Sequence, residues 1–135
     1  MTETLTPDEL ADRLDRAANQ LGPTIKRKMT HAGALGKALI QRNASGRPGP
    51  NIINSEVPNY HDSWKAPTRG IPYGAECTIG TDKPQGMRLE FGFTGIDSIG
   101  RSYAQPPFAH VGPAVPIIEG MLRQYMRQAV QEVFE

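Results

Sequence analysis

The chain has 135 residues, of which 38% are hydrophobic and 7% aromatic, and its formal net charge is +1. This length predicts one domain over residues 1–135, and the balanced charge excludes a general electrostatic attraction to nucleic acid or to an acidic membrane. Glycine (14) and proline (12) make up about a fifth of the chain. We therefore expect long irregular connections around a lean core, with partner molecules completing the burial.

The cysteine content and the N-terminus indicate the compartment. The single cysteine, Cys77, has no second thiol for a disulfide or a metal site. The N-terminus lacks an apolar signal core, and no stretch approaches the roughly 18 apolar residues that span a bilayer. We expect a protein that is made and kept in a reducing cytoplasm and that has no membrane partner.

A long helix is predicted to begin near residue 7. Thr6 is placed as its N-cap, Pro7 suits the first helical position, and Glu9 can close a capping box. Apolar residues then recur every three or four positions to about Ile40, which keeps them on one face: Leu10, Leu14, Ala17, Ala18, Leu21, Ile25, Met29, Ala32, Leu35 and Leu39.

The middle of this helix contains Gly22 and Pro23, which predict either a kink or a break into two helices. A straight rod of roughly 34 residues would be about 50 Å long, whereas a compact domain of this size is about 35 to 40 Å across. The helix must therefore bend or project, and a projecting half with an apolar stripe needs a partner subunit.

The centre of the chain is predicted to form a small antiparallel sheet between two long loops. Residues 43–60 and 94–105 are expected to be the loops. Strands are expected at residues 61–66, 75–79 and 87–93, with turns at 67–72 and 80–86, and the alternation of Leu89, Phe91 and Phe93 makes the third strand the clearest. Cys77 and Met87 are expected in or near the core of the sheet.

Pro116 is predicted to open a closing amphipathic helix that packs on the sheet. The predicted fold class is therefore α+β, with a long N-terminal helix possibly bent at Gly22-Pro23, a small antiparallel sheet with long loops, and a C-terminal helix.

No catalytic, cofactor or metal site is predicted. His61, Asp62 and Ser63 are consecutive, so they cannot line up as a hydrolytic relay, and the three histidines lack metal-ligand spacing. The glycine-rich residues 46–50 lack the Gly-Lys-Ser/Thr of a phosphate loop. An enzyme would instead require a pocket in which His61 or His110 lies beside an acid and a nucleophile.

The basic run Lys26–Lys28, with Lys37 and Arg42 further along, allows a DNA-binding module as a second possibility. Such binding would weaken steeply with salt. A solvated helix face is the simpler interpretation of these charges, because the chain as a whole is close to neutral.

Two short motifs stand out in the second half of the chain: Leu89-Glu90-Phe91-Gly92, and Pro107-Phe108 followed by Pro113-Ala114. In order and spacing they resemble motifs of the tail-completion, or head-to-tail joining, family of long-tailed bacteriophages. That family runs as a long N-terminal helix, a small sheet with a Leu/Val-Glu-Phe-Gly strand, and Pro-Phe and Pro-Ala segments before a closing helix. Leu89, Glu90, Phe91 and Gly92 match the strand motif, and Pro107, Phe108, Pro113 and Ala114 match the segment before the last helix. The family's usual motif before the first strand is replaced here by residues 55–64.

The resemblance implies a structural protein of the virion, assembled in the host cytoplasm and without enzymatic activity or cofactor. It implies a homo-oligomer, a hexameric ring at the top of the tail that bridges the head connector or stopper protein to the tail-tube or tail terminator protein. DNA would pass through the lumen without specific binding. The eight motif residues would lie at interfaces.

The loops 43–60 and 94–105 are hypothesised to make the contacts above and below the ring, since both are too long to be simple connections. The alternative within the same resemblance is a tail terminator, a ring that caps the tail tube and stops its growth.

Overall fold

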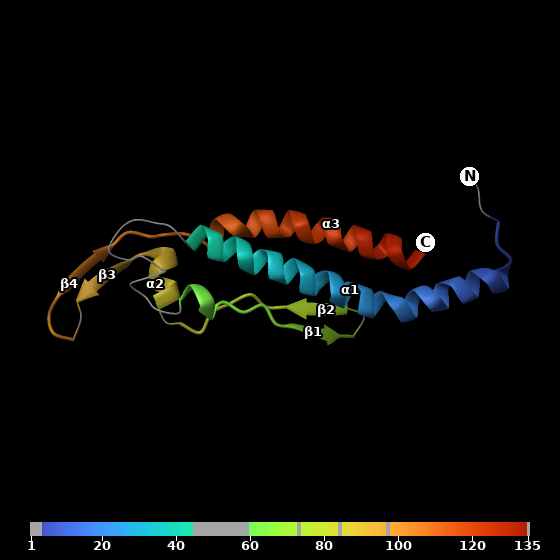
Figure 1. Ribbon diagram of the computed structural model, residues 1–135, viewed down its shortest axis with the longest axis horizontal. Coiled ribbons are helices and arrows are strands. Elements are labelled where there is room, and N and C mark those ends of the chain that lie inside the picture. The colour runs from blue at the N-terminus through green and yellow to red at the C-terminus, as the bar shows by residue number, and fades with distance from the viewer. Residues whose placement is uncertain (1–3, 45–59, 73, 84, 97, 135) are drawn as a thin grey trace.

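The computed structural model describes residues 4–44, 60–72, 74–83, 85–96 and 98–134. It is an elongated molecule in which the helix α1 lies between the helix α3 on one side and the strands β1 and β2 on the other, while α2, β3 and β4 form one end (Figure 1). The predicted α+β class, with a long N-terminal helix, small antiparallel pairing and a closing helix, is confirmed.

The helix α1 (Pro7–Ala44) is continuous over 38 residues. It begins with the predicted capping box: the Glu9 N–H donates to Thr6 Oγ1 at 3.2 Å, and the Thr6 N–H donates to Glu9 Oε2 at 3.1 Å. Gly22 and Pro23 do not break it, and Pro23 is exposed. The helix is about 57 Å long and projects from the rest of the molecule, as one of the two predicted alternatives required. Its first turns extend past both α3 and the β1–β2 hairpin (Figure 1).

The helix α3 (Val115–Phe134) packs along α1, which separates it from β1 and β2. The direct neighbour of the sheet is therefore α1, because glycines let both layers approach this helix closely. A side chain at Gly33 would collide with the sulfur of Cys77 in β2, and one at Gly36 would crowd Ile79 and Ile118 from opposite layers.

The strands β1 (Thr68–Ile71) and β2 (Gly74–Cys77) pair antiparallel, with Thr68 opposite Cys77 and Ile71 opposite Gly74. The prediction of a strand at 75–79 is confirmed in part by β2. The prediction of a turn at 67–72 is wrong. Pro67 and Pro72 lie on either side of the short edge strand β1 and do not interrupt it. The prediction of a strand at 61–66 is also wrong, because this segment begins with the 3₁₀ turn η1 (His61–Ser63).

The strand predicted at residues 87–93 is a helix for most of its length. The helix α2 (Gln85–Phe91) is followed by Gly92, whose φ of 81° is the left-handed conformation common after a helix end. The alternation of apolar residues was misleading: Leu89 is 3% exposed, but Phe91 is 69% exposed and Met87, expected near the core, is 70% exposed.

The loop predicted at 94–105 forms a hairpin of β3 (Phe93–Ile96) and β4 (Ser102–Gln105). Of the loop predicted at 43–60, residues 43 and 44 complete α1, Tyr60 is fully buried, and residues 45–59 lie outside the described part. Within the described residues, no helix is long and apolar enough to cross a membrane.

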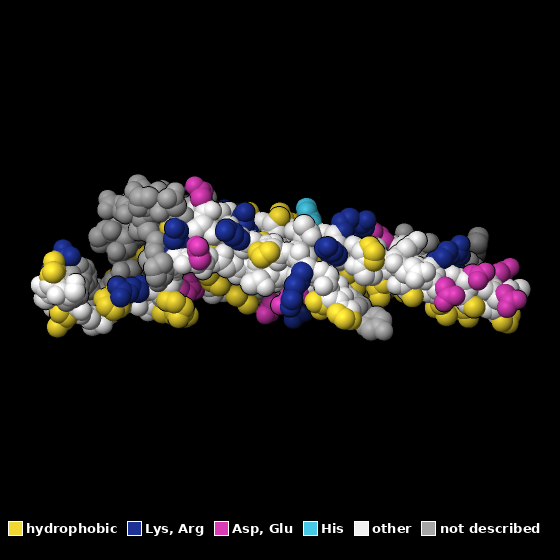
Figure 2. Space-filling view, turned by 90° about the horizontal axis from the view of Figure 1, so that it is seen from below, with side chains coloured by type: hydrophobic (Ala, Val, Ile, Leu, Met, Phe, Trp, Pro, Cys, Tyr) yellow, Lys and Arg dark blue, Asp and Glu magenta, His cyan; other side chains and the backbone are white. Residues whose placement is uncertain are grey.

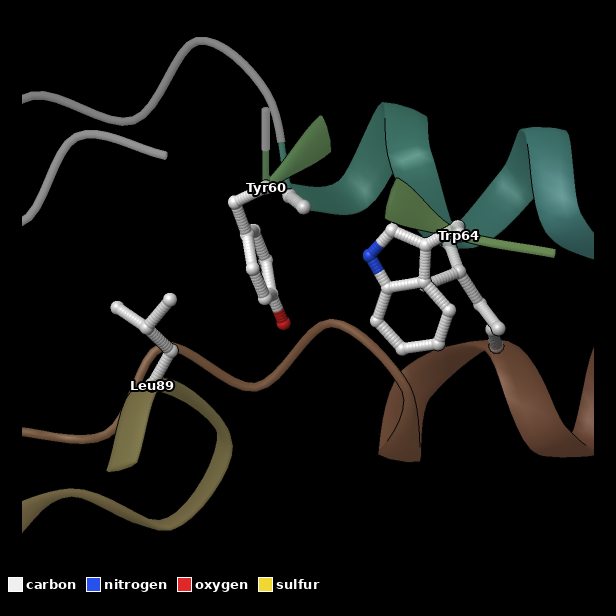
Figure 3. Close-up of a cluster of buried hydrophobic side chains, with 6 residues drawn as sticks. Tyr60, Trp64 and Leu89 are labelled. Atoms are coloured by element: carbon white, nitrogen blue, oxygen red, sulfur yellow. The ribbon is translucent and has the colours of Figure 1, made fainter. Parts of the chain in front are cut away.

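The core lies at the C-terminal end of α1, where helices α1, α2 and α3 converge. Figure 3 shows Tyr60 and Trp64 side by side under α1, with Leu89 reaching toward them from α2. The buried cluster contains Ile40, Ala44, Tyr60, Trp64, Leu89 and Ala114.

Candidate functional site

The two short motifs that carry the phage resemblance contact each other. The Phe108 N–H donates to the Leu89 carbonyl at 2.6 Å, so the segment before α3 runs alongside α2. Leu89 and Ala114 are both buried in the core cluster. Residues about 20 positions apart in the sequence therefore form one structural unit.

Glu90 joins the two segments through its carboxylate. Its Oε2 accepts from the N–H groups of His110 (2.8 Å) and Val111 (3.0 Å), and its Oε1 accepts from the Gly112 N–H (2.8 Å). These N–H groups open the 3₁₀ turn η2 (Gly112–Ala114), which leads directly into α3. Glu90 therefore caps the N-terminus of the closing helix from a distant element, where the helix dipole favours a negative charge.

This environment also fixes the charge of Glu90. Burial acts to raise the pKa of Glu90, but the three backbone hydrogen bonds, together with the nearby His110, outweigh it and hold the pKa below its usual value. The carboxylate is consequently ionised at neutral pH, which is the form that accepts all three bonds.

His110 connects Glu90 to Tyr60 and is only 1% exposed. Its Nδ1 lies 2.7 Å from the Phe108 carbonyl and 3.1 Å from Glu90 Oε2, and its Nε2 lies 2.7 Å from the Tyr60 hydroxyl. Because a carbonyl only accepts, Nδ1 carries a proton, and in the neutral ring Nε2 accepts from the Tyr60 hydroxyl. Burial, with a smaller effect of the Glu90 charge, raises the pKa of Tyr60 to about 12.

Three aromatic rings pack between this hydrogen-bond network and the hydrophobic core. Tyr60, Trp64 and His110 meet pairwise edge to face, with centroids 5.8 to 6.1 Å apart. Figure 3 shows the Trp64 nitrogen on the side of the indole that faces Tyr60. We call Tyr60, Trp64, Leu89, Glu90 and His110 the α2 junction.

A cavity of about 410 Å³ opens beside the α2 junction. Its lining is mainly apolar and includes Trp64, Ile79, Met87, Phe91 and Val111. Met87 and Phe91 are the strongly exposed apolar residues of α2, so the cavity and this surface are continuous. The volume of the cavity is within the range of pockets that bind small molecules.

The cavity places His110 beside an acid, Glu90, and a hydroxyl, Tyr60, which is the arrangement that an enzyme would require. The polar atoms, however, face one another. Both nitrogens of His110 have partners, Tyr60 is 0% exposed, and its raised pKa keeps the hydroxyl protonated at neutral pH. The arrangement is suited to fixing α2 against α3, not to presenting a nucleophile.

The eight predicted interface residues separate into two groups. Leu89, Glu90, Phe108 and Ala114 belong to the inner contact between α2 and the start of α3. Phe91, Pro107 and Pro113 are exposed, and Gly92 forms the turn after α2. Their role at an interface between molecules stays a prediction.

Sequence reasoning missed Tyr60 and did not foresee that His110 contacts Glu90. His110 was named as a residue that an enzyme pocket would require, and its ring is buried against residues 20 and 50 positions away. The sequence carried no local signal for this contact, since Glu90 and Tyr60 are 20 and 50 positions away from His110.

The other candidate sites take simple structural roles. His61, Asp62 and Ser63 form η1, where Ser63 Oγ donates to the Tyr60 carbonyl at 2.6 Å. His31 is exposed on α1, with its ring against Tyr125. Among the described residues, no group of His, Cys, Asp and Glu could hold a metal ion.

The basic cluster Lys26–Lys28 forms part of the contact between α1 and α3. Arg27 and Lys28 both pair with Glu132, the latter at 2.9 Å, and Lys28 also lies 3.4 Å from Gln128. The hydrogen bond from Lys28 and the neighbouring positive charges lower the pKa of Glu132. Two of the three cations are thus engaged within the molecule.

A comparison with protein families, curated proteins and solved structures finds no match to this chain.

Proposed function

We propose that the protein is a non-enzymatic structural subunit of the neck of a long-tailed bacteriophage. In this proposal copies of the chain form a ring that joins the tail tube to the head connector or stopper and lets DNA pass through its lumen. The protein would act through contacts with its own copies and with these neighbours.

The observation that carries the proposal is the apolar surface at the end formed by α2, β3 and β4. Four large apolar side chains there, Met87, Phe91, Ile96 and Ile99, are each about 70% exposed. An isolated two-stranded hairpin is marginally stable in water, and in the described residues β3 and β4 make extensive contacts only with each other. A surface of this kind is typical of an element that a partner covers.

The α2 junction supports the same proposal, because it fixes this apolar end to the body of the molecule. Glu90 and His110 connect α2 to the start of α3, and the cation of Arg88 lies 4.0 Å from the centre of the Phe93 ring at the start of the hairpin. These contacts hold α2 and the start of the hairpin in a fixed position, and an assembly contact requires exposed side chains that are held in this way.

Ile96→Asp together with Ile99→Asp tests the proposal. Both side chains are exposed, so the variant should fold normally, but charged residues should prevent the hairpin from entering an apolar contact. When the variant is supplied to cells infected by a phage that lacks the wild-type gene, it should yield heads and tails that fail to join, seen by negative-stain imaging and as a loss of infectious particles.

Ile71→Asp is the matched control, since Ile71 is also exposed but lies in the other hairpin. It should leave particle yield unchanged. A normal yield from the Ile96 and Ile99 variant would refute joining through this end. Overlong tail tubes in place of separate heads and tails would favour the tail terminator instead.

A further inference from the structure

The first turns of α1 carry an apolar strip that lies beyond the end of α3. Leu10 and Leu14 are 47% and 50% exposed, and their spacing continues the face of α1 on which Ala17 is buried. The end of α3 is marked by Arg13, whose side chain donates to the Phe134 carbonyl at 2.6 Å. We call residues 7–16 the α1 overhang.

The α1 overhang and the body of the molecule have opposite charges. The overhang carries four carboxylates and two arginines: Asp8, Glu9, Asp12 and Asp15 with Arg13 and Arg16. Residues 17–44 and 115–134 carry seven basic residues and two acidic ones: Lys26, Arg27, Lys28, Lys37, Arg42, Arg123 and Arg127 with Glu119 and Glu132. Figure 2 shows acidic and hydrophobic side chains gathered at the end where α1 runs alone, and basic ones along the centre.

The outer side of α3 offers a matching surface. Met126, Arg127, Val130 and Gln131 line a shallow apolar groove, and Val130 and Phe134, one turn apart, are 51% and 44% exposed. Arg123 and Arg127 are exposed on the same helix at positions that put them beside this row. We call Met126, Val130 and Phe134, with these two arginines, the α3 strip.

We propose that the α1 overhang of one copy packs on the α3 strip of a second copy. Leu10 and Leu14 have the same four-residue spacing as Val130 and Phe134, so the two rows form ridges that can pack as neighbouring helices do. The overhang has two more acidic than basic residues and the strip carries two arginines, so the opposite net charges steer the two surfaces together.

Charge also selects between the possible arrangements of two copies. Two overhangs packed on each other would bring like charges together, whereas overhang on strip joins opposite ones. Each copy then uses its overhang to bind one neighbour and its strip to bind another. Such heterologous contacts close into rings or extend as filaments. The contact deepens the proposed function, since it supplies the subunit contact of the ring, but it is tested without phage particles.

Two complementary variants provide the test. Leu10→Asp with Leu14→Asp disables the overhang, and Val130→Asp with Phe134→Asp disables the strip; each leaves the other surface intact. The wild type should form oligomers by light scattering, and each variant alone should be monomeric, with self-association weakened by about 100-fold or more. An equimolar mixture of the two variants should form a dimer and nothing larger, because only one competent pair of surfaces remains.

The controls show whether the loss of self-association is specific to these two surfaces. Ile117→Asp changes a residue of α3 that is 57% exposed and lies outside the strip, and it should keep the wild-type mass. Circular dichroism should show all variants folded. About 1 M NaCl, where the screening length is about 3 Å, should raise the dissociation constant of the wild type by about tenfold.

Wild-type oligomers from both variants, or a mixture that stays monomeric while the wild type assembles, would overturn the contact. A wild type that is monomeric at every concentration would also overturn it. In each case the variant Ile96→Asp with Ile99→Asp still tests whether the protein joins heads to tails. A failure of the subunit contact can therefore be told apart from a failure of the proposed function.

Discussion

The two ends of α1 have the same hydrophobic pattern but opposite surroundings. At the C-terminal end, Ile40 and Ala44 are 2% and 1% exposed and lie in the core cluster beside Tyr60 and Trp64. At the N-terminal end, Leu10 and Leu14 are about half exposed, and the helix runs past its neighbours (Figure 1). An i, i+4 pattern thus shows that a helix face is to be covered, but not whether the same chain or another one covers it.

The difference separates folding from assembly within a single helix. One end of α1 is surrounded by α2, α3 and the aromatic rings, so substitutions there act on the free energy of unfolding. The other end has few contacts within the molecule, so substitutions there should act on association. The following substitutions compare the two ends, beginning with the largest expected effect.

Trp64→Ala should give the largest loss of stability. Trp64 is 6% exposed and packs edge to face on both Tyr60 and His110, and removing a buried aromatic side chain costs about 3–5 kcal/mol. Urea unfolding followed by circular dichroism measures the free energy of unfolding. A loss below about 1 kcal/mol would show that the aromatic cluster is not the centre of the core and would remove the contrast between the ends of α1.

Glu90→Gln should cost about 1–3 kcal/mol, because three backbone N–H groups at the start of α3 lose a charged acceptor. The pKa of Glu90 is lower in the folded chain than in the unfolded one. Its contribution is therefore present above the unfolded pKa, near 4.5, and is lost as pH falls through the folded pKa.

Urea unfolding of the wild type and the variant at several pH values between neutral and acidic measures this contribution. The wild type should lose stability more steeply than Glu90→Gln on acidification. Glu76→Gln is a suitable control, since Glu76 pairs with Arg69 at the exposed surface of the β1–β2 hairpin and contributes little. Parallel pH profiles for the wild type and Glu90→Gln would contradict the capping role.

The sequence predicted the two long helices α1 and α3 better than the parts between them. The capping box at Thr6 and Glu9 and the proline at the start of α3 are local signals, and both helices begin where these signals place them. The segment 87–93 was misassigned because its alternating residues satisfy a strand pattern over a few positions, while Gly92, which ends α2, was counted as part of the strand.

The candidate site could not be predicted because it depends on contacts between distant segments. Glu90 and the N–H groups of residues 110–112 meet only when α2 packs beside the start of α3, and Tyr60 reaches His110 across 50 positions. A single sequence gives the types of these residues but not their proximity. The two short motifs were recognised as units, although their contact with each other was not foreseen.

Tyr60→Phe should cost about 1 kcal/mol, because the ring still fills its place in the core while His110 Nε2 loses its hydrogen-bond partner. The pKa of Tyr60 is raised from 10.0 to about 12, so the protonated hydroxyl favours the folded state. This contribution is present below pH 10 and decreases as pH rises toward about 12. Unfolding measured between about pH 9 and 11 should show a steeper loss for the wild type than for Tyr60→Phe, and equal slopes would contradict the buried hydroxyl.

Leu10→Ala with Leu14→Ala should change the stability of the monomer least, by less than about 0.5 kcal/mol. Alanine has the higher helix propensity, and the two leucines are about half exposed on turns of α1 that extend past both neighbouring layers, so the loss of apolar contacts is largely offset. The same substitution should weaken self-association, because the proposed contact buries what the monomer leaves exposed. Unfolding at low protein concentration and sedimentation at high concentration separate the two effects. A large loss of monomer stability would mean that the N-terminal end of α1 contributes to folding as its C-terminal end does, and the distinction between a folding end and an assembling end would not hold.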